Sequence, residues 1–522
     1  MSQKKVDFKP TFGAFVIETL TLGMYGEARN ALREYVQNAF DSLREAVAAD
    51  VLASDEAKVE ITMGADKNSL TIRDNGLGLS VTNAVETLAA IGASSKNYRK
   101  NAGFRGIGRL AGIVFCNKLT FTTKASGENE KTVVEFKAKE LREKLAPEGD
   151  YSANAAETLS STVDAFHESA PDLSEHFFEV KLEGFENAPA ECVDKSLLCS
   201  FLSQVSPIPY SEAFSLASTI VEQGKKRKIE VETIRVLVRE GDEEYVELHK
   251  PYGKDFAVKN KRVEVTTEIV ESPSGRWWGW VGRPKLSGGI KDQDSRGIRV
   301  RVRNIQIDDT KIIREIFAVS RLADTKARSS YARFADWYVG EIFVDPKAAI
   351  PNARRDGFEE NVAWDEIRNE LDVAVATPYG KLAYRTSNRD QLSLDNLQSR
   401  FGILQKGAEP LIQAGRSDWD QVSVIVSQAN ELQSRISRSV KSADDAELTV
   451  LTDLSQKTAD VKEALAAIAS PAPPLHDCSA EIAEAVSAVV QKLYADLRRN
   501  LPPTEWKKAQ AIVLKSTGEP FD

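Results

Sequence analysis

The sequence REYVQNAFDS, at residues 33–42, lies within a run whose apolar residues recur at the spacing of one helix face. This spacing predicts an amphipathic helix over residues 28–48. Its apolar stripe consists of Leu32, Val36, Ala39 and Leu43. Glu34, Asn38 and Asp41 project from another face, because residues three or four apart are neighbours on a helix. Taken alone, this polar face is more typical of a solvated helix surface than of a functional site.

A second motif, LTIRDNGLGL at residues 70–79, predicts a short strand that runs directly into an Asp and two glycines. On its own, such a stretch most often forms a hairpin turn. However, Gly76 and Gly78 would let the backbone approach a flat ligand closely. Asp74 would then be able to accept a hydrogen bond from an exocyclic amine, such as that of adenine.

A third motif, GFRGIGRLAG at residues 103–112, overlaps the start of an apolar run that is predicted to be helical over residues 110–115. Glycines before a helix leave backbone N–H groups unpaired and present a positive dipole end, which suits a phosphate group. By itself, the motif is equally an ordinary turn or a site of close helix packing.

Together, these motifs resemble, in order and spacing, those of the GHKL ATPases, the superfamily of gyrase, HtpG-type chaperones, histidine kinases and MutL. The resemblance implies a Bergerat-type ATP-binding sandwich of α/β (α+β) class, with ATP and Mg²⁺ as its ligands. No Walker A sequence is present as a competing nucleotide motif. The two-domain layout of the chain is most similar to that of HtpG-like and MORC-like proteins.

The resemblance implies a role for each matching residue. Glu34 matches the general base, Asn38 the magnesium ligand, and Asp74 the carboxylate that reads the adenine amine. The other expected ATP-binding residues are Asp41, Gly76, Gly78, Ser95, Lys96, Gly103, Gly106 and Gly108. Histidine kinases generally lack a base at the position of Glu34, so its presence favours ATP hydrolysis. The segment IGASSK, residues 91–96, resembles the start of the lid.

The chain departs from the family at the strand that completes the adenine pocket. The chaperone and MutL families usually carry a Gly-Thr pair ahead of this strand, whereas this chain reads EHFFEVKLEGF at residues 175–185. The resemblance therefore does not define the hydrogen bonds that this strand would make around the adenine.

A second region of resemblance to the HtpG chaperones comprises SRGIRVRVRNIQIDD at residues 295–309 and YVGEIFVDPKAAIPNARRDGFEEN at residues 338–361. In that family an Asn-containing turn at this place carries an arginine that reaches the γ-phosphate. The match assigns the turn to Asn352 and Arg355, with Arg354 as the alternative arginine. A guanidinium binds phosphate oxygens bidentately, which would make domain docking depend on the nucleotide. The alternative is a surface basic turn beside Asp356.

The predicted organisation has three parts, at residues 1–215, 216–385 and 386–522. The first is the ATP-binding domain, and Pro207 and Pro209 end its last helix, expected over residues 196–205. Its strands are expected at 59–63, 70–73, 119–124, 132–136 and 177–182, with a polar helical or looped stretch at 139–175. The second part is an α/β middle domain, with strands expected at 228–238, 263–269, 277–281, 298–307 and 338–344.

The last part is predicted to be helical. One apolar stripe runs from Ile425 to Val440 and another from Leu448 to Ile468. These stripes would form either a dimer contact or helix packing within one chain. A final helix is expected over residues 480–500, after the helix-breaking sequence SPAPPL at residues 470–475.

Composition narrows the function classes. The chain of 522 residues is 42% hydrophobic and 28% charged, as expected for a soluble globular protein. Its net charge of -9 argues against nucleic-acid binding through a globally basic surface. The four cysteines show no metal-ligand spacing and are expected to be reduced thiols. Since no apolar run is long enough for a signal peptide or a membrane span, we expect a cytoplasmic protein that does not contact membranes.

Three functions remain open from the sequence. The first is an ATP-driven clamp that resembles HtpG, forms a homodimer and acts on a protein client. The second is a MORC-like or MutL-like clamp that acts on DNA in genome defence, including antiviral defence, or in repair. In that case the basic runs 225–228, 259–262 and 296–303 would line a DNA channel. The third is a nucleotide-gated scaffold for a partner protein.

Overall fold

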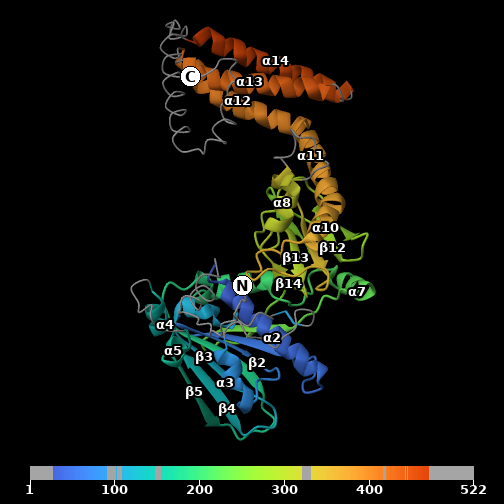
Figure 1. The fold of residues 1–522 in the computed structure, drawn as a ribbon. Coiled ribbons are helices and arrows are strands. Elements are labelled where there is room, and N and C mark those ends of the chain that lie inside the picture. The colour runs from blue at the N-terminus through green and yellow to red at the C-terminus, as the bar shows by residue number, and fades with distance from the viewer. Residues whose placement is uncertain are drawn as a thin grey trace, which may run out of the picture. The chain divides into compact units, whose positions relative to one another are not determined.

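The computed structural model describes residues 27–90, 101–102, 108–146, 155–319, 331–415, 419–440, 443 and 445–469. The chain divides into two compact units, residues 1–387 and residues 388–522. The first unit contains the sheets, and the described part of the second is helical (Figure 1).

The first sheet has eight strands in the order β5-β4-β3-β6-β2-β1-β7-β8. All neighbouring pairs are antiparallel except β1 and β7, which are parallel. The strands are β1 (Lys58–Met63), β2 (Ser69–Asp74), β3 (Cys116–Lys124), β4 (Glu130–Phe136), β5 (Val163–Ser169), β6 (Phe177–Phe185), β7 (Arg235–Glu240) and β8 (Val246–Glu247). Although β7 and β8 lie beyond the expected boundary near residue 215, both join this sheet.

Helices cover one face of this sheet, and Figure 1 shows α2 and α3 across its strands. The helical segments of this region are α2 (Asn30–Ala48), α3 (Val81–Ala89), η1 (Gly108–Val114), α4 (Ala138–Leu145), α5 (Ala155–Ser160), η2 (Ala190–Cys192) and α6 (Lys195–Val205). The next helix, α7 (Ala217–Arg227), packs instead against Trp278 of the second sheet. The predicted stripe of α2 is buried, with Leu32 and Val36 each 1% exposed. Alternate residues of β1 and β2 are also buried, as expected for strands with one face in a core.

The second sheet has five strands in the order β11-β12-β15-β13-β14. Its strands are β11 (Val265–Glu271), β12 (Trp277–Pro284), β13 (Gly297–Val302), β14 (Ile305–Ile307) and β15 (Val339–Val344), and β9 (Phe256–Val258) pairs separately with β10 (Lys261–Val263). The helical segments that follow or flank it are α8 (Lys311–Val319), η3 (Ala332–Trp337), α10 (Val362–Leu371), a π-helical turn (Asp372–Ala376) and α11 (Thr377–Gln391).

Charged residues are buried within this part of the first unit. Glu341 of β15 is fully buried and lies 2.9 Å from the Lys250 ammonium, and it also pairs with Arg301. Burial alone would raise the pKa of Glu341, but Arg301 and Lys250 hold it at about 2. The carboxylate is therefore the shared counter-ion of two buried cations.

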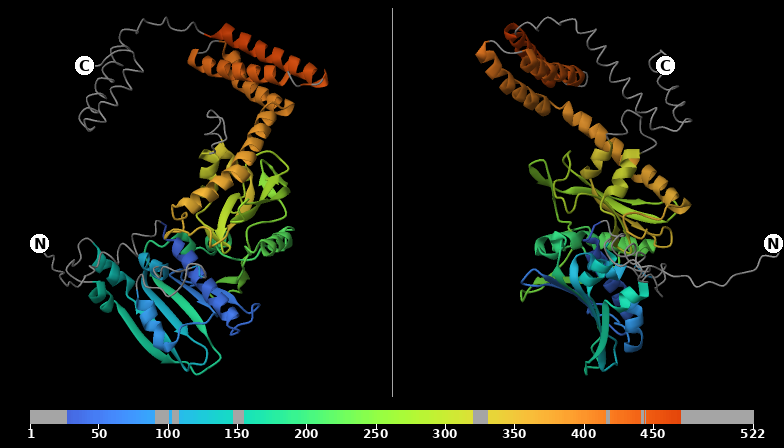
Figure 2. Two further views of the ribbon diagram at one scale, coloured as in Figure 1. Left: turned by 45° about the vertical axis from the view of Figure 1, so that its right-hand side comes forward. Right: turned by 60° about the vertical axis from the view of Figure 1, so that its left-hand side comes forward.

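The second unit contains helices α12 (Leu394–Ala414), α13 (Trp419–Val440) and α14 (Asp445–Ile468), which lie side by side (Figure 2). Their apolar residues form a common core that includes Leu404, Leu432 and Leu454. Both predicted stripes contribute to this core, so helix packing within one chain accounts for most of their apolar surface. Val440 and Leu448, at the ends of the stripes, remain 37% and 39% exposed.

The predicted fold class is confirmed: an α/β N-terminal sheet region is followed by a second sheet and a helical C-terminal region. Three local predictions were wrong. The run 298–307 is a hairpin and not one strand, because Arg303 and Asn304 take left-handed φ values of 52° and 61° and turn the chain. The strand expected over 228–238 begins only at Arg235, and the stretch 139–175 contains the edge strand β5.

Within the described residues, no helix combines the length and the apolar character that crossing a membrane requires. Cys116, Cys192 and Cys199 are free thiols, and burial raises the pKa of both Cys116 and Cys192 to about 12. These two thiols are therefore held in the unreactive protonated form at neutral pH.

Candidate active site

Glu34 lies on a buried face of α2, where the residue is 8% exposed. Two guanidinium groups approach its Oε1 atom: Nη2 of Arg33 at 3.8 Å and Nε of Arg355 at 3.5 Å. Among the described residues, this oxygen is buried and accepts no hydrogen bond. Asp41 on the same helix is 0% exposed, so this polar face is not the solvated surface that the motif alone would suggest.

Arg355 comes from a tight turn that follows β15. The backbone N–H of Asn352 donates to the carbonyl of Gly357 at 3.1 Å, and Arg355 itself has a φ of 56°. The carbonyl of Arg355 accepts from the N–H of Asp308 at 2.8 Å, while its guanidinium donates to the carbonyl of Ala102. The turn therefore fixes Arg355 beside Glu34 from both its backbone and its side chain.

Arg354, the alternative arginine, has an exposed side chain. Its backbone carbonyl accepts a hydrogen bond from Nη2 of Arg33 at 3.0 Å. The two neighbouring arginines thus play different parts in the geometry, since only the Arg355 guanidinium contacts the Glu34 carboxylate.

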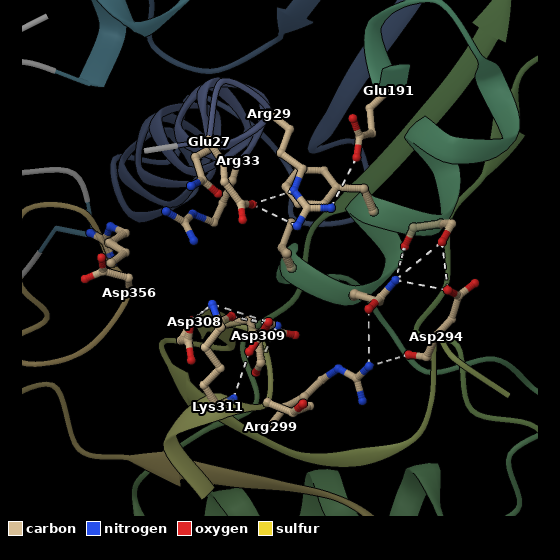
Figure 3. Close-up of a pocket in the computed structure, with 18 of the residues that line it drawn as sticks. Glu27, Arg29, Arg33, Glu191, Asp294, Arg299, Asp308, Asp309, Lys311 and Asp356 are labelled. Carbon is tan, nitrogen blue, oxygen red and sulfur yellow. Dashed lines mark hydrogen bonds and ion pairs between the residues drawn. The ribbon is translucent and has the colours of Figure 1, made fainter. Parts of the chain in front are cut away.

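A cleft of about 800 Å³ borders these arginines (Figure 3). Arg33 and Arg355 line it, together with carboxylates such as Asp308. Burial and the neighbouring Asp309 raise the pKa of Asp308 to about 6. The cleft is therefore lined by charges of both signs, and one of its carboxylates titrates close to neutral pH.

Asn38 and Asp41 lie one and two turns after Glu34 on α2. Asn38 is half-buried, and the Asp41 carboxylate accepts a hydrogen bond from the backbone N–H of Ala102 at 2.7 Å. Asn101 donates to Glu45 of the same helix at 2.5 Å. α2 therefore holds residues 101–102 in place, immediately before the predicted glycine motif.

Asp74 ends β2 at 3% exposure and accepts a hydrogen bond from the N–H of Gly76 at 2.9 Å. Neither predicted glycine leaves room for a side chain. A Cβ on Gly76 would lie 2.1 Å from the hydroxyl of Ser42, and one on Gly78 would lie 2.0 Å from the carbonyl of Lys124. Gly78 also has a φ of 65°, which other residues rarely adopt. Both glycines are therefore required by the packing of neighbouring protein atoms around this turn.

Two residues that sequence reasoning missed also contact this turn. The hydroxyl of Thr123 on β3 accepts a hydrogen bond from the N–H of Leu79 at 2.8 Å, and a ring nitrogen of His176 lies 2.7 Å from the carbonyl of Gly76. A threonine in a β-strand is too common to be singled out. One sequence feature could have pointed to His176: it lies directly before β6, where the family usually carries a Gly-Thr pair.

Gly108 begins η1, a seven-residue 3-10 helix that covers most of the helical run expected over residues 110–115. The next residue, Arg109, donates to the carbonyl of Ala90, and burial lowers its pKa to about 10. This contact joins the two ends of the segment that contains the predicted lid. Ser95, Lys96, Gly103 and Gly106 lie outside the described residues.

The arrangement provides a buried carboxylate, Glu34, near an arginine and a second buried carboxylate, Asp74, at the end of a strand. No group of three or more His, Cys, Asp or Glu that would hold a metal occurs in the described part of the chain. A magnesium ion bound with ATP needs few protein ligands, because phosphate oxygens and water complete its octahedral shell. The side-chain amide oxygen of Asn38 is of a suitable type for one such ligand.

Part of this chain is similar to known ATPases and chaperones. Residues 26–164 match the family model described as histidine kinase-, DNA gyrase B- and HSP90-like ATPase. The chain is 25% identical over 186 residues to the chaperone protein HtpG of Hydrogenovibrio crunogenus, covering 32% of this chain and 28% of that protein. It is 32% identical over 152 residues to HtpG of Burkholderia lata, covering 26% of this chain and 23% of that protein.

The match thus spans only about a quarter of the length of these curated relatives. The family-model match, residues 26–164, includes all three motifs, from Glu34 through Asp74 to Gly108. The predicted resemblance is confirmed, with an HtpG-like relationship: residues 26–164 of this chain carry a domain of the histidine kinase-, DNA gyrase B- and HSP90-like ATPase family.

Proposed function

We propose that this chain binds ATP with Mg²⁺ and hydrolyses the nucleotide, with Glu34 as the general base that activates the attacking water. The observation that carries the proposal is the buried Glu34 carboxylate, 3.5 Å from an arginine that comes from a distant turn of the chain. In this role, Asn38 is a magnesium ligand and Asp74 reads the adenine amine. Asp41 and the glycines of the second and third motifs, with Ser95 and Lys96, complete the ATP-binding residues.

A general base must present an acceptor to water in line with the γ-phosphate. The Oε1 atom of Glu34 is suited to this, because the two arginines near it stand at 3.5 and 3.8 Å, longer than a strong hydrogen bond. The magnesium ion would supply charge stabilisation at the phosphates when it is bound. Glu34 itself then has only to orient one water molecule and take its proton.

Arg355 would link hydrolysis to docking of the part of the chain that carries it. Its guanidinium can contact the γ-phosphate as well as Glu34, since its planar fork suits phosphate oxygens. The turn that carries it lies 321 residues beyond Arg33, yet it accepts a hydrogen bond from that side chain at 3.0 Å. We therefore propose a nucleotide-gated conformational clamp whose engine resembles that of HtpG, acting as a homodimer on a protein client or partner.

The alternative of a DNA-acting clamp has less support. Arg299 and Arg301 of the basic run 296–303 are only 1% and 0% exposed, so they are not available to line a DNA channel. In the other two runs, Arg227 pairs with Glu271 at 2.5 Å and Arg262 pairs with Asp255 at 2.5 Å. An ATPase rate that rises with DNA in a salt-dependent manner would nevertheless favour the DNA clamp. Stimulation by an unfolded protein favours the HtpG-like clamp, and stimulation by one specific partner alone favours the scaffold.

ATP binding can be tested with Asp74→Asn. One oxygen of Asp74 already accepts from Gly76, and an asparagine has only one acceptor oxygen for both that N–H and the adenine amine. We expect this variant to lose ATP binding in calorimetry. The matched control is Asp66→Asn in the exposed turn between β1 and β2, which should bind ATP as the wild type does. Unchanged ATP binding by Asp74→Asn would refute the assignment of Asp74 as the residue that recognises adenine.

A further inference from the structure

The end of the turn at residues 74–79 is bonded to a buried hydroxyl. Thr123 is 0% exposed, and its Oγ1 accepts from the N–H of Leu79 at 2.8 Å and donates to the carbonyl of Phe177 at 3.1 Å. A hydroxyl has one proton to donate, so both of these bonds depend on the same atom. Thr123 therefore joins the end of the turn to the first residue of β6.

His176 holds the middle of the same turn. Its Nδ1 lies 2.7 Å from the carbonyl oxygen of Gly76. Because a carbonyl oxygen can only accept, we assign the proton to Nδ1, which carries it in one neutral tautomer and also in the imidazolium form. The contact is thus compatible with either charge state of the ring. The N–H of the same glycine donates to Asp74, so His176 and Asp74 act on opposite sides of one residue.

There is little space for this turn to move without disturbing its neighbours. A Cβ on Gly78 would lie only 2.0 Å from the carbonyl oxygen of Lys124, the residue after Thr123. The turn therefore lies directly on the end of β3. A shift of β3 or of the residues before β6 would change the position of Asp74 relative to a bound base.

We propose that Thr123 and His176 are positioning residues that fix the 74–79 turn for recognition of the adenine base. This inference rests on the ATP-binding function proposed above and deepens it. Both residues act on the adenine side of the site, through Gly76, Leu79 and Phe177. Among the described contacts, neither residue touches Glu34 or Arg355. They therefore set the affinity and selectivity for the base, while the hydrolysis step depends on Glu34.

The test is a steady-state comparison of Thr123→Val with wild type. Valine keeps the shape and burial of the side chain but removes the shared donor and acceptor. Both bonds of Thr123 are lost, but only the bond to Leu79 belongs to the turn, so we expect KM for ATP to rise about tenfold, with kcat changed less than about twofold. The preference for ATP over GTP should fall in parallel. Thr123→Ser restores the hydroxyl and should restore KM.

The matched control is Thr122→Val, since the neighbouring side chain of β3 points to the opposite face of the sheet. It should leave KM unchanged. His176→Leu should raise KM as Thr123→Val does, and His176→Asn, which keeps an N–H donor, should recover part of the loss. Melting temperatures measured alongside separate this effect from unfolding.

Equal KM and equal base preference in wild type, Thr123→Val and His176→Leu would overturn the positioning role while leaving ATP binding intact. A fall in kcat and melting temperature without a change in KM would also overturn it. If the wild-type chain binds no ATP, both this inference and the proposed function fail together.

Discussion

Replacing Arg355 with glutamine tests how strongly the distant turn contributes to hydrolysis. The guanidinium is 7% exposed and its Nε lies 3.5 Å from Glu34, so the substitution removes a charge from a buried site. Loss of a hydrogen bond that involves a charged group costs about 1.5 to 3 kcal/mol. If the guanidinium makes one such bond to the γ-phosphate in the transition state, as proposed above, kcat should fall about 10- to 150-fold, since about 1.4 kcal/mol corresponds to a factor of ten.

Arg354→Gln is the matched control, because it changes the neighbouring residue of the same turn, whose side chain is exposed. Single-turnover hydrolysis with saturating ATP measures the chemical step in each variant, and nucleotide binding is measured in parallel. Arg355→Gln should hydrolyse slowly while Arg354→Gln stays within about threefold of wild type, well below one charged hydrogen bond. The reasoning is refuted if both variants lose the same activity, or if only Arg354→Gln does.

Three further substitutions test the packing and electrostatics. Gly78→Ala should destabilise the first unit by about 1 to 3 kcal/mol in urea unfolding, because of the left-handed φ and the occupied space at its Cβ; a wild-type midpoint would contradict this. Glu341→Gln should lower the free energy of unfolding by about 3 to 5 kcal/mol at pH 7, since Lys250 and Arg301 lose their buried counter-ion. Its pKa of about 2 lies below the usual 4.5, so this stabilisation is present above pH 4.5 and disappears as the pH falls towards 2. Asp308 has the opposite sign: its raised pKa of about 6 makes wild-type stability fall as pH rises through about 4 to 6. Asp308→Asn should therefore be more stable than wild type by about 1 to 3 kcal/mol at pH 8 and equal to it at pH 4, and a pH-independent difference would refute the shift.

The sequence predicted the elements that carry their own local signal. The stripe of α2 and the strand β2 running into Asp74 both follow from periodicity and composition, and both were found close to their expected bounds. The glycines at 76 and 78 were expected to let the backbone approach a flat ligand, whereas the structure gives a different reason for them, because neighbouring protein atoms leave no room for a side chain.

Features that depend on contacts between distant residues were not predictable in this way. The burial of Glu34 results from packing against a turn more than 300 residues away, so a helix pattern alone pointed to solvent. β7 joins the first sheet by pairing with β1, a long-range parallel contact that no local pattern encodes. Likewise, the basic run around Arg301 suggested an exposed side chain, but Arg301 is buried, where it pairs with Glu341.

The central claim is most directly tested by Glu34→Ala, with single-turnover hydrolysis and ATP affinity measured on the same preparation. Glu34→Gln, which keeps the side-chain volume between Arg33 and Arg355, serves as the structurally conservative companion. We predict that both variants bind ATP with near wild-type affinity and hydrolyse it at least about 100-fold more slowly, as expected when a general base is removed. Hydrolysis at the wild-type rate by either variant would contradict the assignment of Glu34 as the base.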